Sequence, residues 1–115
     1  MVCGSKDDQH NELVYGVMSD YFSNNPVGIL INSNQRGIDA YVGHLSQNYN
    51  YQIRTYFAHY RFTNISANFK RNKKAIIDEY PDIIICFVKR QSLSIHRTIR
   101  YARKKGIKVM VYPLD

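Results

Sequence analysis

Six consecutive apolar residues, Ile83 to Val88, place the strongest constraint on the fold of this chain. The run is bounded by Asp82 and Lys89 and is too short for a helix, so it predicts a strand that is buried on both faces. Such strands occur in parallel sheets whose two faces are covered by helices. The sequence therefore predicts an α/β fold with this strand among the inner strands of the sheet.

The rest of the chain alternates strand-like and helix-like segments around this run. Apolar residues at helical spacing follow Asp7 or Asp8, follow Ile38, and recur over residues 69–80 and 92–106. Strand-like segments cover residues 1–3, 27–31, 53–57, 83–88 and 108–112, and residues 53–57 should bury one face. The alternation predicts a Rossmann-like three-layer domain with about five parallel strands in the order 3-2-1-4-5. We expect one domain over residues 1–115, because a chain of this length has room for a single core.

Charge is divided unevenly along the chain. Residues 1–50 carry a net charge of −3 and residues 51–115 a net charge of +10. A basic half predicts an anionic partner, which includes nucleotides, polynucleotides and acidic proteins. For the cluster formed by Arg100, Arg103, Lys104 and Lys105, a solvated helix face is the alternative.

Location and thiol chemistry follow from the same composition. No apolar run approaches the ~20 residues of a membrane span, and the first residues do not resemble a signal peptide. We therefore expect a cytoplasmic protein without a membrane partner. Cys3 and Cys86 lie in apolar strand-like segments, which favours buried reduced thiols over a disulfide or a metal site.

Polar residues follow the predicted strands at the edge where open parallel sheets bind ligands. Residues 32–36 form a turn between a strand and a helix, where backbone N–H groups and the helix dipole attract an anion. Many such turns in α/β proteins bind nothing, so the turn alone leaves both interpretations open. The other strand ends supply residues 4–7, 58–60 and 88–90.

Five motifs are similar, in order and spacing, to those of a known family. They are CGSKD at 3–7, NSNQRGID at 32–39, KRN at 70–72, PDIIICF at 81–87 and ARKKGI at 102–107. Over nearly its whole length the chain resembles the YspA-like branch of the SLOG superfamily. Members of that superfamily are Rossmann-like domains that bind nucleotide-derived ligands.

The resemblance implies a ligand pocket at the strand ends. Lys6, Arg36 and Arg71 would pair with phosphate oxygens, and Gly4 would let the backbone approach a phosphate. Asp39 would orient Arg36 or accept a hydrogen bond from a ribose hydroxyl, although an acidic residue near a helix N-terminus needs no ligand to explain it. The complete set of expected ligand-binding residues is Gly4, Ser5, Lys6, Asn32, Ser33, Asn34, Arg36, Gly37, Asp39, His59, Arg71, Asn72, Lys89 and Arg90.

Departures from the family pattern argue against catalysis. Ser33 and Asn34 replace paired glycines, and residues 88–94 lack the glycine-rich turn and the glutamate of the related cytokinin-activating branch. Without that carboxylate, glycoside cleavage loses its base. We expect no catalytic residue, no cofactor and no metal. The expected function is binding of a small nucleotide-derived anion, such as ADP-ribose or cyclic ADP-ribose, by a sensor or a sequestering sponge.

Two further expectations and two alternatives remain. The Asn-, Tyr- and Ile-rich composition suits an AT-rich genome, of which a phage genome is one example. Family members commonly pair through helices, which predicts a homo-oligomer. One alternative is a nucleotide-processing hydrolase or transferase. Another is a nucleic-acid binder that uses the basic half and its interleaved tyrosines. The candidate acid–base groups for the hydrolase are His10, His44, His59 and His96.

Overall fold

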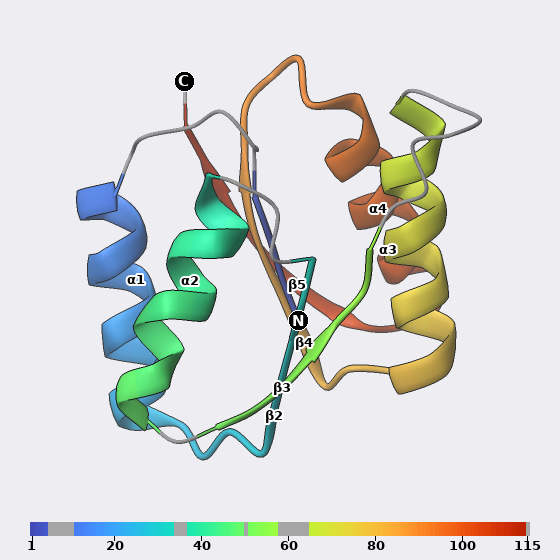
Figure 1. The fold of residues 1–115 in the computed structure, drawn as a ribbon. Coiled ribbons are helices and arrows are strands. Elements are labelled where there is room, and N and C mark those ends of the chain that lie inside the picture. The colour runs from blue at the N-terminus through green and yellow to red at the C-terminus, as the bar shows by residue number, and fades with distance from the viewer. Residues whose placement is uncertain (5–10, 34–36, 50, 58–64, 115) are drawn as a thin grey trace.

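The computed structural model describes the chain except residues 5–10, 34–36, 50, 58–64 and 115. Strands and helices alternate through the described residues (Figure 1). The elements are β1 (Val2–Gly4), α1 (Asn11–Asn24), β2 (Ile29–Asn32), α2 (Ile38–Ser46), a 3-10 turn η1 (Gln47–Tyr49), β3 (Gln52–Thr55), α3 (Ile65–Glu79), β4 (Ile83–Val88), α4 (Leu93–Lys104) and β5 (Lys108–Pro113).

All strand pairs described are parallel, and β4 is the central strand of its sheet. β1 and β5 flank β4, with Cys3 opposite Cys86 and Phe87 opposite Tyr112. β2 pairs with β3 in a second sheet, and β2 lies beside β1 without a hydrogen-bonded ladder among the described residues. The α/β class and the inner position of residues 83–88 are confirmed. The hydrogen-bonded strands nevertheless form a three-stranded and a two-stranded sheet, and β1 is only three residues long.

Helices cover the strands from two sides, and β4 contributes to both cores. Figure 1 shows α1 and α2 on one side of the strands and α3 and α4 on the other. Ile85 and Phe87 pack with residues of α1 and α2, whereas Ile84 and Cys86 pack with α3 and α4. Side chains alternate between the two faces of a strand, so an unbroken apolar run fills two cores at once. The predicted three-layer arrangement of helices on both faces is confirmed.

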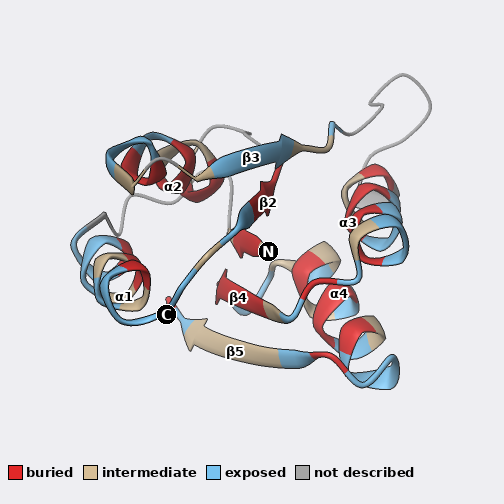
Figure 2. Ribbon diagram, turned by 90° about the horizontal axis from the view of Figure 1, so that it is seen from below, coloured by how far each residue is buried: buried red, intermediate tan, exposed pale blue. Residues whose placement is uncertain are grey.

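Two expectations about the middle of the chain are wrong. Residues 53–57 do not bury one face, because Ile53 is 37% and Phe57 70% exposed. Figure 2 shows β3 as an exposed edge, and a strand at an edge gains little cover from neighbouring helices. The third helix begins at Ile65, before the expected Phe69, and Ile77 points away from the core at 59% exposure.

The last helix ends as expected. Gly106 has φ of 79°, the left-handed conformation that favours glycine after a helix. Ser92 occupies the N-cap position of α4, but its hydroxyl makes no capping hydrogen bond. Cys3 and Cys86 are both buried and free. None of the helices in the described part of the chain is long and apolar enough to cross a bilayer.

Candidate functional site

Several of the expected ligand residues that the structure describes lie at the carboxyl-terminal edge of the strands. In Figure 1 this edge is at the top, where β1, β2 and β4 end and where α2, α3 and α4 begin. Asn32 ends β2, and Ser33 follows it directly. Asp39 is the second residue of α2. All three side chains are buried.

Asp39 is the centre of a buried polar cluster. Its Oδ2 accepts hydrogen bonds from the Ser33 amide at 3.2 Å and from the Ser33 hydroxyl. Asn32 donates from Nδ2 to the Asp39 backbone carbonyl at 3.1 Å. Among the described residues, Oδ1 of Asp39 and Oδ1 of Asn32 are buried acceptors without a hydrogen-bond partner. Buried polar groups are nearly always paired, so these two acceptors call for a donor that the described residues do not supply.

Burial dominates the titration of Asp39. It raises the pKa of this carboxyl above the ordinary value of 3.8. The hydrogen bonds from Ser33, the positive charge of Arg71 and the backbone N–H of Gly4 oppose this effect without cancelling it. Below about pH 4 the Asp39 carboxyl is protonated in both the folded and the unfolded protein, so it costs no stability there. As the pH rises from that point through the raised pKa, the free energy of unfolding falls, because ionising the buried carboxyl is unfavourable.

We expect Asp39→Asn to stabilise the protein at neutral pH. The amide removes the cost of ionising a buried carboxyl, so the gain in unfolding free energy should grow as the pH rises above about 4 and level off once the pH exceeds the raised pKa of Asp39. Urea unfolding at a series of pH values measures this gain. Asp20→Asn, an exposed acid on α1, is the control and should show no such trend. Parallel stability curves for wild type and Asp39→Asn would contradict the assignment of a destabilising ionised carboxylate.

Arg71 is held in place by amides. The side chain is 9% exposed, and its Nε and Nη2 donate to Asn72 Oδ1 at 3.0 and 2.9 Å. Its Nη1 donates to Asn68 Oδ1 at 3.2 Å. Among the described residues no carboxylate forms an ion pair with Arg71, although its charge acts on Asp39. A buried guanidinium with neutral partners keeps its full positive charge available for an anion.

Asn72 makes hydrogen bonds to two other side chains of the protein. Its Oδ1 holds Arg71, and its Nδ2 donates to Thr98 Oγ1 at 2.9 Å. Thr98 in turn donates to the Ser94 carbonyl at 2.8 Å. The amide therefore connects α3 to α4 and positions Arg71. Sequence reasoning missed Thr98, and the signal that could have found it was a polar residue in the apolar stripe of α4 that contains Ile95 and Ile99.

Packing explains the glycine at position 4. A Cβ on Gly4 would lie 2.3 Å from Ile38 Cγ2 and 2.4 Å from Ile38 Cβ. Glycine is thus needed for the first turn of α2 to pack against the end of β1. Gly37, at the N-cap of α2, has φ of 87°, which also favours glycine. These two glycines place Asp39 next to the end of β1.

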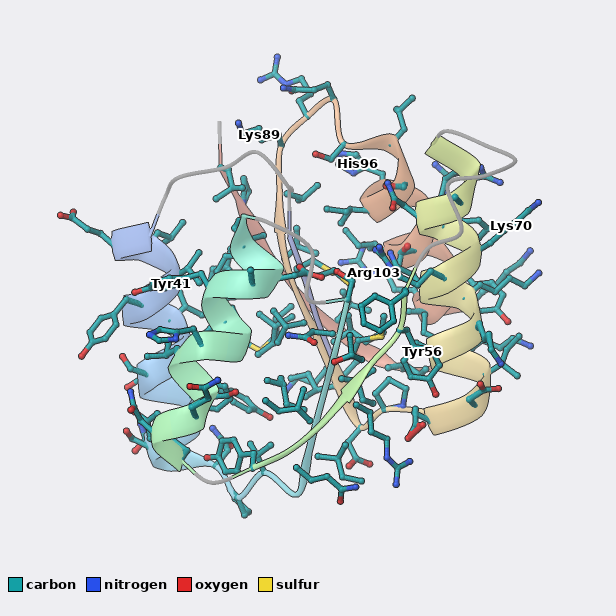
Figure 3. All side chains as sticks on the ribbon, in the orientation of Figure 1. Tyr41, Tyr56, Lys70, Lys89, His96 and Arg103 are labelled. Atoms are coloured by element: carbon teal, nitrogen blue, oxygen red, sulfur yellow. The ribbon has the colours of Figure 1, made fainter. Side chains whose placement is uncertain are left out.

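The remaining expected site residues are partly placed. Lys89 and Arg90 follow β4 at the same edge of the sheet, and Figure 3 shows Lys89 and His96 near the top of the molecule. His96 Nε2 lies 3.1 Å from the Lys89 carbonyl oxygen. His44 is exposed in α2. Other expected or alternative site residues lie outside the described residues, namely Ser5, Lys6, His10, Asn34, Arg36 and His59.

A cavity lies at the opposite end of the strands. It has a volume of about 350 Å³ and opens between the starts of β1, β2 and β4. Met18, Phe22 and Leu30 contribute apolar wall, and Glu79 and Asp82 contribute negative charge. It contains none of the expected ligand residues. In the part of the chain that the structure describes, no group of three or more metal-ligating side chains occurs.

Comparison with known proteins identifies no relative. No family model matches the chain, and neither a curated protein nor a solved structure does.

Proposed function

We propose that the chain binds a small nucleotide-derived anion, such as ADP-ribose or cyclic ADP-ribose, at the carboxyl-terminal edge of β1 and β2. The observation that supports this most directly is a pair of buried acceptors, Asp39 Oδ1 and Asn32 Oδ1, that have no hydrogen-bond partner among the described residues. Arg71 is close enough for its charge to act on Asp39. A ligand with both hydroxyl donors and phosphate oxygens complements such a site. The resemblance to SLOG domains gives the same ligand class.

Each chemical group of such a ligand has a partner in this arrangement. Ribose hydroxyls or an exocyclic amine would donate to the unused oxygens of Asp39 and Asn32, which removes the cost of burying them unpaired. A phosphate would accept from Arg71 and from the backbone at the start of α2. Arg36, outside the described residues, would add a second guanidinium. Lys89 and Arg90 would bound the site on the β4 side.

One observation favours an alternative, a nucleotide-processing hydrolase or transferase. A buried carboxyl with a raised pKa is the kind of group that general acid–base catalysis uses, and Asp39 fits that description. We favour binding without cleavage because Ser33 already donates twice to Oδ2 of this carboxylate. Mass spectrometry of the ligand after incubation decides between the two: cleavage by wild type and not by Asp39→Asn would establish the enzyme.

The proposal includes an architecture and a setting. The two hydrogen-bonded sheets would act as one sheet in the order 3-2-1-4-5, which the neighbouring positions of β1 and β2 support. As a domain without an attached effector, the protein would work as a sensor subunit or as a sponge in bacterial cytoplasm, and the sponge would suit a phage. Pairing of copies into a homo-oligomer is part of this proposal.

Calorimetry with ADP-ribose-type ligands and, separately, with a short single-stranded oligonucleotide tests the proposal. Arg36→Ala should weaken ADP-ribose binding roughly tenfold to a hundredfold, because it removes a charge-assisted hydrogen bond of about 1.5–3 kcal/mol. Lys104→Ala, an exposed charge on α4, should leave this affinity unchanged. The pocket hypothesis would be wrong if the two variants lost the same amount of ADP-ribose affinity, or if the protein bound the oligonucleotide and no ADP-ribose-type ligand.

A further inference from the structure

Rings and cations alternate along the outer seam between α3 and α4. Arg97 lies over the ring of Phe69, with its guanidinium carbon 4.3 Å from the ring centre. Phe69 meets Tyr101 edge to face at 6.2 Å. Lys73 and Lys105 place Nζ at 5.4 and 5.6 Å from the Tyr101 ring centre. These five residues form what we call the α3–α4 seam.

The helical repeat gives the seam its order. Arg97, Tyr101 and Lys105 are four residues apart, so they form one row along α4 with about 6 Å between successive members. Phe69 and Lys73 form the facing row on α3. Both rows are accessible, since the three cations are exposed and the two rings are only partly buried. Figure 2 shows α3 and α4 side by side on one flank of the sheet.

Positive charge around the seam is not balanced locally. Lys70, Arg100 and Lys104 also lie on these two helices, and Figure 3 shows Lys70 projecting away from the sheet. α4 contains no acidic residue. The two acids of α3 are already bonded, Asp78 to Lys74 at 2.8 Å and Glu79 to Arg54 and Tyr56. Within the described residues, no carboxylate pairs with the cations of the seam.

We propose that the α3–α4 seam binds single-stranded nucleic acid. Rings and a guanidinium plane accept stacked bases, and lysine and arginine side chains bind the phosphates between them. An acidic protein or an anionic membrane would match the charge, yet neither makes use of alternating rings and cations. Duplex DNA keeps its bases stacked on each other, which leaves the rings without partners. This surface lies on the flank of the domain and is separate from the strand ends around Asp39.

Fluorescence anisotropy with a labelled oligothymidylate of about 12 nucleotides tests the seam. Tyr101→Leu keeps apolar packing but removes the ring, and it should weaken binding roughly fivefold to a hundredfold. Tyr101→Phe should bind as wild type does. Tyr15→Leu, an exposed tyrosine on α1 at 54%, is the matched control and should have no effect.

A salt series gives an independent measure of the cations. Replacing Arg100 and Lys104 with alanine should lower affinity and reduce the slope of log affinity against log salt by roughly 0.7 for each phosphate that is no longer neutralised. The proposal fails if Tyr101→Leu binds the oligothymidylate with wild-type affinity and only the replacement of Arg100 and Lys104 lowers the affinity. It also fails if the protein binds vesicles containing phosphatidylserine, or an acidic peptide, but does not bind the oligothymidylate. Binding of ADP-ribose at the strand ends is unaffected by either result.

Discussion

Replacing Gly4 with alanine is expected to lower the free energy of unfolding by about 3 kcal/mol, which corresponds to roughly 10–15 °C in Tm. The added Cβ would lie 2.4 Å from Cβ of Ile38, an atom next to the backbone of α2. A rotamer change cannot relieve that overlap, so the start of α2 must move away from β1. The same movement would displace Asp39.

Gly16→Ala is the matched control for this prediction. A Cβ at Gly16 meets nothing within 4 Å, and the residue lies inside α1. Alanine there should raise stability by about 0.5–1 kcal/mol, because glycine loses more backbone freedom on folding. Thermal unfolding followed by circular dichroism measures both variants. Equal Tm values for Gly4→Ala and wild type would mean that α2 does not pack against the end of β1 as described.

The second large effect concerns Arg71 and ligand affinity. Arg71→Met retains most of the length of the side chain and removes its charge, so affinity for ADP-ribose should fall roughly tenfold to a hundredfold, or about 1.5–3 kcal/mol. Lys74→Met removes a charge about one turn further along the same helix. Lys74 is exposed and paired with Asp78, so this change should leave affinity unaltered.

Two results separate a binding role of Arg71 from a structural one. Arg71→Met also leaves the Asn72 and Asn68 amides without their donor, which costs stability. Circular dichroism must therefore show that the variant is folded at the temperature of the calorimetry. A folded Arg71→Met protein with wild-type affinity would exclude Arg71 from the site. Equal reductions for Arg71→Met and Lys74→Met would indicate a general charge effect.

The sequence predicted the layers well because simple patterns determine them. An unbroken apolar run such as residues 83–88 has to be covered on both faces, and the apolar stripes at Val14 and Ile99 supply helices for the two sides. Gly106 follows the end of α4 for a local reason, since its left-handed φ favours glycine. These features depend on residues that are neighbours in the chain.

The features that the sequence did not reveal depend on interactions between residues that are distant in the chain. Alternation in residues 53–57 suggested a buried face, but β3 lies at an edge that no helix covers closely, which sequence alone does not reveal. The role of Asn72 depends on Thr98, which is 26 residues away and on another helix. Gly4 was expected to let the backbone approach a phosphate, and the structure adds a packing reason for the glycine that the sequence did not show, the close approach of Ile38.

The sequence indicated which residues lie near the candidate site, but not which of their atoms are hydrogen-bonded. The residues at the ends of β1 and β2 do lie together with Asp39, as the parallel topology requires. The unused oxygens of Asp39 and Asn32 could not be foreseen, because satisfaction of a buried acceptor depends on the position of every neighbouring donor. The central claim is that these residues bind a nucleotide-derived anion.

Native mass spectrometry of the purified protein with added ADP-ribose tests that claim most directly. We predict one intact ligand bound to each chain, on wild type and on Lys74→Met, with markedly lower occupancy on Arg71→Met. The same spectrum gives the number of chains in the assembly. Absence of any bound nucleotide-derived ligand from the folded wild-type protein, across ADP-ribose and its cyclic form, would contradict the account.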